Sequence, residues 1–260
     1  MISAGIDAGL ETIKVVLLND GSMLSHVVIP AGKEATALVV QRAMQRAEID
    51  GNVEFRDVAC IVSTGMASEY IPFKTEHVGE VLCCVKGVSH VHPSTRTVID
   101  VGAEKCLVAK CRDGKAIRTA RNEVCAAGSG RYLEMVASVL GIDVREMGQL
   151  AMRSTEAVEV NTTCAVFAES EVISLLHLNK KPEDILRGVF KGMADRIYSL
   201  LARVDFEKDV TLIGGLGANV GIVQALEERI DGKVHVPENP NIVEALGAAL
   251  IAREKGAART

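Results

Sequence analysis

The apolar positions of the chain follow two periods, the two-residue period of strands and the 3.6-residue period of helices. The first 91 residues predict three strands, a helix, a fourth strand and a second helix. Their ranges are Ile2–Asp7, Ile13–Leu18, Leu24–Ile29, Lys33–Ile49, Val58–Ser63 and His77–Val91. Short strands that alternate with helices indicate an α/β fold.

The same order of elements begins again near residue 96, which indicates a duplicated domain. Three strands precede a largely helical region that extends to Arg203, and the chain closes with a strand from Val210, a helix, a short strand and a final helix. The remaining ranges are Thr97–Asp100, Cys106–Lys110, Ala116–Ala120, Val220–Ile230, Lys233–Val236 and Ile242–Lys255. We therefore expect two lobes, residues 1–95 and 96–260, with a closing helix at 240–256 able to pack back on the first.

One short motif occurs in both halves, in a turn between two predicted strands. Ile6-Asp7-Ala8-Gly9-Leu10-Glu11 returns as Ile99-Asp100-Val101-Gly102-Ala103-Glu104. A glycine in such a turn lets backbone amides approach an anion, and an aspartate at the strand end can hold a metal-bound water. The repetition predicts a duplicated domain that holds a nucleotide between its halves.

A third glycine cluster, Gly214-Gly215-Leu216-Gly217, follows the strand at Val210 and precedes a helix. It is interpreted either as a tight turn without a ligand or as a surface for adenine or ribose, beside a helix start that favours negative charge. Together the three segments resemble the ATPase domain shared by actin, Hsp70 chaperones and sugar kinases. This resemblance implies a duplicated actin-like (ribonuclease H-like) ATPase fold, with two lobes around a nucleotide cleft.

Composition narrows the function further. The net charge of −5 gives no basic surface for nucleic acid. The longest uncharged run, 210–226, contains four glycines and predicts no membrane span. The seven cysteines lack the spacing of a secreted disulfide scaffold, so we expect a cytoplasmic protein.

Two cysteines stand out because each lies just before an apolar helical pattern. Cys125 precedes Ala-Ala-Gly-Ser-Gly-Arg-Tyr-Leu-Glu, and Cys164 precedes Ala-Val-Phe-Ala-Glu-Ser-Glu. A helix start favours thiolate, and thiolates bind metal clusters. Two thiolates are too few for an iron–sulfur cube, but a symmetric dimer supplies four. The alternative is that these cysteines are buried small residues, which is the role expected of Cys60, Cys83, Cys84, Cys106 and Cys111.

The cysteine segments and the nucleotide segments together resemble the ATP-dependent activator component of 2-hydroxyacyl-CoA dehydratases and the related ATPase subunits of benzoyl-CoA reductases. The resemblance extends from Gly5 to Ala252. It implies one [4Fe-4S] cluster shared by two subunits through Cys125 and Cys164. It also implies that hydrolysis of ATP drives an electron from ferredoxin or flavodoxin to a partner, the CoA-thioester dehydratase or reductase component.

The resemblance also implies the other site residues, with ATP or ADP and Mg²⁺ as cofactors. The expected catalytic carboxylates are Asp7, Asp100 and Glu104. The expected cofactor-binding residues are Gly9, Thr12, Lys14, Gly102, Gly128, Ser129, Gly130, Gly214, Gly215 and Gly217.

The second hairpin departs from the activator pattern, in which the motif reads Asp-x-Gly-Gly-Gln-Asp. Ala103 adds a methyl group where backbone approaches phosphate, and Lys105 replaces a carboxylate. A similar change in a reductase subunit keeps open a heterodimer with a related ATPase beside the homodimer. A small-molecule kinase of the same superfamily, with Asp100 as its base, is the alternative function.

Overall fold

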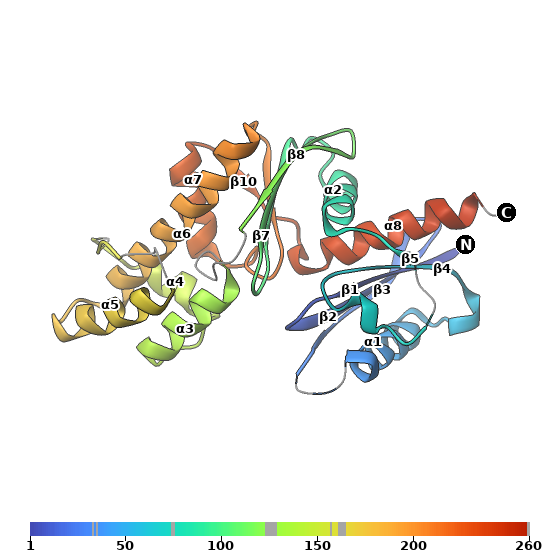
Figure 1. Cartoon of the computed structure of the whole chain (residues 1–260), viewed down its shortest axis with the longest axis horizontal. Coiled ribbons are helices and arrows are strands. Elements are labelled where there is room, and N and C mark those ends of the chain that lie inside the picture. The colour runs from blue at the N-terminus through green and yellow to red at the C-terminus, as the bar shows by residue number, and fades with distance from the viewer. Residues whose placement is uncertain are drawn as a thin grey trace. The chain divides into compact units, whose positions relative to one another are not determined.

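The computed structural model describes residues 1–258 except 33, 35, 74–75, 123–128, 157 and 161–164. The chain forms two compact units, each containing a five-stranded sheet (Figure 1). Unit 1 comprises Met1–Ser94, Cys111–Ala116 and Asn241–Thr260, and unit 2 comprises Thr95–Lys110 and Ile117–Pro240. No helix in the described part of the chain is both long enough and apolar enough to cross a bilayer.

The sheet of unit 1 has the order β3-β2-β1-β4-β5 and is covered by helices on both faces. Alternate residues of β2 face opposite layers. Ile13, Val15 and Leu17 pack with α1, whereas Val16 and Leu18 pack with α8. The elements are β1 (Ile2–Ala8), β2 (Thr12–Asn19), β3 (Ser22–Pro30), α1 (Thr36–Gly51), β4 (Val58–Thr64), β5 (Glu76–His77), α2 (Glu80–Val91) and α8 (Val243–Ala257).

The sheet of unit 2 has the order β10-β9-β6-β7-β8, and its core is shared with five helices. The largest of them, α6, contributes the buried Phe190, Met193 and Ile197. The elements are β6 (Thr97–Val101), β7 (Cys106–Arg112), β8 (Lys115–Arg121), α3 (Gly130–Leu140), α4 (Met147–Ala151), α5 (Ala165–His177), α6 (Pro182–Val204), β9 (Val210–Ile213), α7 (Val220–Ile230) and β10 (Val234–His235).

The two sheets correspond strand by strand, as the repeated sequence pattern predicts. β1 pairs antiparallel with β2 and parallel with β4, and β6 pairs antiparallel with β7 and parallel with β9. At the far edge, β5 and β10 are both two-residue strands that pair in parallel with their neighbours. The Asp–Gly motifs therefore occupy matching turns, β1–β2 and β6–β7.

The structure corrects the predicted helix at His77–Val91. His77 instead belongs to β5, whose pairing with β4 is extended by a 2.9 Å hydrogen bond from the Val78 amide to the Ser63 carbonyl. The helix begins only at Glu80, because Gly79 has an extended backbone with ψ of 144°. Pairing with a strand distant in sequence therefore overrides the local apolar pattern.

Candidate functional site

The first Asp–Gly hairpin holds a buried ion pair. Asp7 ends β1 with only 4% of its surface exposed, and its cross-strand partner in β2 is Lys14. The Lys14 ammonium lies 2.8 Å from Asp7 Oδ2. The Gly9 amide donates a 3.1 Å hydrogen bond to the carbonyl of Thr12, which closes the turn. The structure thus brings together the predicted residues Asp7, Gly9, Thr12 and Lys14.

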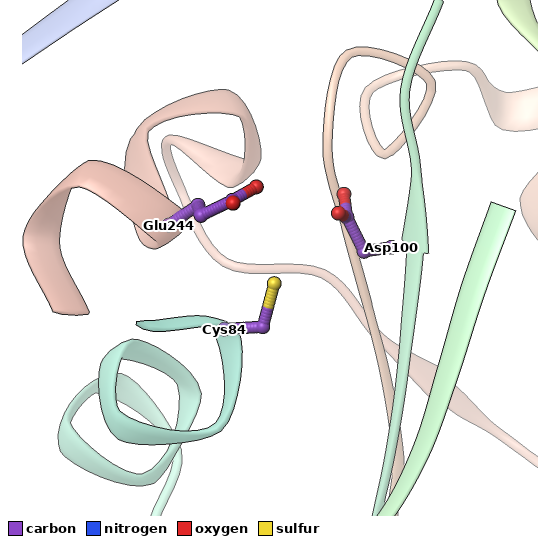
Figure 2. A group of neighbouring side chains, drawn as sticks. All are labelled: Cys84, Asp100 and Glu244. Carbon is purple, nitrogen blue, oxygen red and sulfur yellow. The ribbon is translucent and has the colours of Figure 1, made fainter. Parts of the chain in front are cut away.

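The second hairpin repeats this arrangement with different residues. The Gly102 amide donates a 2.9 Å hydrogen bond to the Lys105 carbonyl, as Gly9 does to Thr12. Asp100 is 2% exposed, and Lys105 Nζ lies 3.2 Å from its Oδ2. Figure 2 shows the Asp100 carboxylate projecting from its strand. Each unit therefore carries a buried aspartate paired with a lysine beside a glycine turn.

Each aspartate also packs against a glycine that follows the neighbouring parallel strand. Gly214 follows β9 with φ of +87°, and an added Cβ would lie 2.5 Å from Asp100 Oδ1. Gly65 follows β4 with φ of +90°, and an added Cβ would lie 2.6 Å from Asp7 Oδ1. The sequence analysis predicted Gly214 but missed Gly65, although Ser63-Thr64-Gly65 ends the corresponding strand of the first half.

Replacing Gly214 with alanine is expected to displace the Asp100 carboxylate. The left-handed backbone costs an L-residue roughly 1–2 kcal/mol, and the methyl group would also collide with Asp100 Oδ1. We expect both a loss of stability in chemical denaturation and weaker nucleotide binding. Gly32→Ala is the matched control, because Gly32 also has a positive φ of +64° but no atom lies within 4 Å of its added Cβ. Equal effects of the two substitutions would contradict this assignment.

The predicted adenosine segment forms a compact turn between β9 and α7. The Gly214 amide donates to the Pro240 carbonyl at 2.9 Å, and the Gly217 amide donates to the Gly214 carbonyl at 3.1 Å. Asn219 caps α7 by accepting a 3.0 Å hydrogen bond from the Gly221 amide. Nothing lies within 4 Å of a Cβ added at Gly215, which leaves space beside the backbone there.

The second hairpin is bonded directly to the start of α3. The Gly130 amide donates to the Gly102 carbonyl at 2.9 Å, and the Arg131 amide donates to the Ala103 carbonyl at 2.8 Å. An ion pair joins Arg131 Nε to Glu104 Oε1 at 2.9 Å. Ser129, the N-cap residue of α3, is fully buried. Two backbone hydrogen bonds and one ion pair therefore join the hairpin to the first turn of α3.

Of the predicted site residues, Cys125, Cys164 and Gly128 lie outside the described residues. The five other cysteines are buried, as predicted. Burial raises the pKa of Cys83 and of Cys106 to about 12, which disfavours the thiolate form that a metal requires. Cys84 lies on α2 with its Sγ within 4.8 Å of a carboxylate oxygen of Glu244 on α8 (Figure 2).

Each of the two remaining cysteines is followed by a helix within five residues in the sequence. α3 begins at Gly130, five residues after Cys125, and α5 begins at Ala165, immediately after Cys164. α5 also exposes large apolar side chains, because Phe167 is 68% exposed and Ile173 is 40% exposed. A single copy of the chain thus presents apolar surface on the helix next to Cys164.

Two matching sheets, two Asp–Gly hairpins and a later Gly–Gly turn define an ATPase of the actin-like fold class. The chain belongs to the BadF/BadG/BcrA/BcrD ATPase family, whose model matches residues 4–252. Solved structures of much lower identity support the fold alone. One of these is a ROK hexokinase from Thermus thermophilus, with 17% identity, a TM-score of 0.54 and coverage of 98% of this chain and 99% of that chain.

Curated relatives match this chain almost end to end. The 2-hydroxyisocaproyl-CoA dehydratase activator of Clostridioides difficile is 35% identical over 97% of this chain and 95% of its own length. The activator of lactoyl-CoA dehydratase of Anaerotignum propionicum is also 35% identical, over 98% of both chains. One of the subunits of the benzoyl-CoA reductase of Thauera aromatica is 30% identical over 96% of this chain and 92% of its own length.

The fold matches a solved activator structure closely. The activator of the 2-hydroxyisocaproyl-CoA dehydratase from Clostridium difficile, determined with bound ADPNP, superposes with a TM-score of 0.94. The identity is 34%, and the match covers 100% of this chain and 97% of that chain. The predicted resemblance and fold class are both confirmed.

Proposed function

We propose that this protein is an ATP-hydrolysing activator that delivers a low-potential electron to a CoA-thioester dehydratase or reductase. The end-to-end match to dehydratase activators at 35% identity is the observation that carries this proposal. The small-molecule kinase has less support, since the hexokinase match reflects fold alone.

In the proposed mechanism the two units are the lobes of the ATPase, and each hairpin contributes to binding the phosphates of ATP. Asp7 and Asp100 are the carboxylates that would hold a nucleotide-bound Mg²⁺, because each is buried at a strand end, and the ion would neutralise phosphate charge. Glu104 is the third carboxylate proposed to take part in ATP hydrolysis. Lys14 and the backbone of the two turns would contact phosphate oxygens, while Gly214, Gly215 and Gly217 would support the adenosine.

We propose that Cys125 and Cys164 from each of two subunits bind a [4Fe-4S] cluster. The burial of the other cysteines supports this choice. All five cysteines in the described part of the chain are buried, whereas these two precede helices α3 and α5. Such a cluster supplies a one-electron carrier of low potential. Four thiolates require a dimer, and the exposed Phe167 and Ile173 of α5 are the kind of surface that a dimer covers.

We infer that nucleotide chemistry reaches Cys125 through α3. The Gly102 and Ala103 carbonyls accept hydrogen bonds from the first two amides of α3, and Glu104 pairs with Arg131. A change of the nucleotide bound at this hairpin would therefore act on α3 through these bonds. A change at this helix start alters the field and amide hydrogen bonds available to Cys125.

Anaerobic purification followed by assays of iron, ATP hydrolysis and reduction potential tests this function. We expect about four irons per dimer, an absorption shoulder at about 400 nm and a potential that differs between the ADP and ATP states. A stable iron-bearing homodimer with ATPase activity supports a dehydratase activator. A chain that gains iron only with a second, related ATPase supports the reductase heterodimer. An iron-free protein that phosphorylates a small molecule would show that the proposed function is wrong.

A further inference from the structure

In each hairpin a lysine pairs with the buried aspartate, but the two lysines occupy different positions relative to the aspartate in the pairing of the strands. In unit 1 the cross-strand partner of Asp7 is Lys14 itself. In unit 2 the corresponding partner of Asp100 is Leu107, which is 5% exposed. Lys105 lies two residues earlier, before β7 begins, yet its ammonium reaches the Asp100 carboxylate. The cation is thus present in both hairpins although the register position is not the same.

Each lysine also lies across the glycine of its own turn. A Cβ added at Gly102 would lie 3.2 Å from Lys105 Cγ, and one added at Gly9 would lie 3.3 Å from Lys14 Nζ. The absent side chains therefore make room for the lysines at the two turns that the proposed function assigns to phosphate binding. The Lys105 side chain remains accessible to solvent, since it is 25% exposed, whereas the Asp100 side chain is 3% exposed.

We propose that Lys105 is a phosphate-binding residue of the second hairpin, with a nucleoside di- or triphosphate as its ligand. This inference rests on the proposed function, in which that hairpin contacts phosphate. Without a cation, the Asp100 carboxylate would repel phosphate oxygens. An ammonium on a flexible stem neutralises the carboxylate and binds phosphate as a point charge. Lys105 thereby has the same role at Asp100 that Lys14, the cross-strand partner of Asp7, has in the first hairpin.

The competing explanation is that Lys105 only compensates the buried charge of Asp100, and two variants separate the two roles. Lys105→Met keeps most of the stem but removes the charge, and it is compared with the double variant Asp100→Asn/Lys105→Met, in which no carboxylate remains unpaired. Affinity for ADP and ATP is measured by calorimetry in EDTA, so that Mg²⁺ does not contribute. Stability is measured by chemical denaturation. Lys115→Met, at an exposed position of β8, is the matched control.

We expect both Lys105 variants to bind nucleotide about tenfold to hundredfold more weakly than the wild type, as for the loss of a charged hydrogen bond. Lys105→Arg should retain part of the affinity, and Lys115→Met should retain all of it. If the wild type binds nucleotide and either Lys105→Met or the double variant binds it equally well, this inference is wrong but the proposed function stands. A wild type that binds no nucleotide would overturn the proposed function as well.

Discussion

Replacement of Cys125 or Cys164 by serine is expected to abolish iron binding. Each substitution removes two of the four thiolates that a dimer offers, and a tetranuclear cube needs about four. The dimer should also loosen, because the shared cluster would no longer link the subunits. Iron analysis and size-exclusion chromatography under anaerobic conditions measure both effects.

The matched controls for this experiment are Cys83→Ala and Cys84→Ala. Both cysteines are fully buried in α2, and burial raises the pKa of the Cys83 thiol to about 12. We expect iron content to be unchanged in these variants, with only a loss of stability from the small cavity. Iron near four per monomer in the wild type, or full iron content in Cys125→Ser, would show that the cluster is not shared through these residues.

The parts of the fold that were predicted from the sequence depend on local signals. The duplication was visible because Ile-Asp-x-Gly occurs twice in the same register. The range of α7, Val220–Ile230, was predicted to the residue, since Asn219 caps its start and Asp231 ends it in the left-handed conformation. Similarly, the expected core role of Cys83 and Cys84 follows from their place in an apolar helix.

The parts that were not predicted depend on contacts between distant segments. β5 is a two-residue strand defined by its pairing with β4, so the local sequence pattern does not predict it. Gly65 lacks the Gly–Gly signature of Gly214, and its role becomes visible only where it packs on Asp7. The pairing of Lys105 with Asp100 depends on the reach of a side chain across the turn rather than on its register position.

Replacement of Asp100 by asparagine is expected to lower ATP hydrolysis by about 10²–10⁴-fold while ADP binding and iron content persist. The amide keeps the shape of the buried side chain, which is 3% exposed, but it no longer carries the charge that holds metal-bound water in the proposed mechanism. Asp7→Asn should have an effect of similar size, because Asp7 occupies the matching strand end in the first hairpin. Phosphate release from ATP and ADP affinity, measured on the same preparations, separate catalysis from binding.

Asp113→Asn is the matched control for the loss of an aspartate charge. Asp113 is exposed in the turn between β7 and β8 with a φ of 51°, a conformation that asparagine also adopts readily. Its substitution should leave hydrolysis unchanged, because Asp113 lies outside the two turns that carry the Ile-Asp-x-Gly motif, β1–β2 and β6–β7. If Asp100→Asn hydrolyses ATP as fast as Asp113→Asn, then Asp100 is not a catalytic carboxylate, and hydrolysis would have to depend on Glu104 or on Asp7 of the first hairpin.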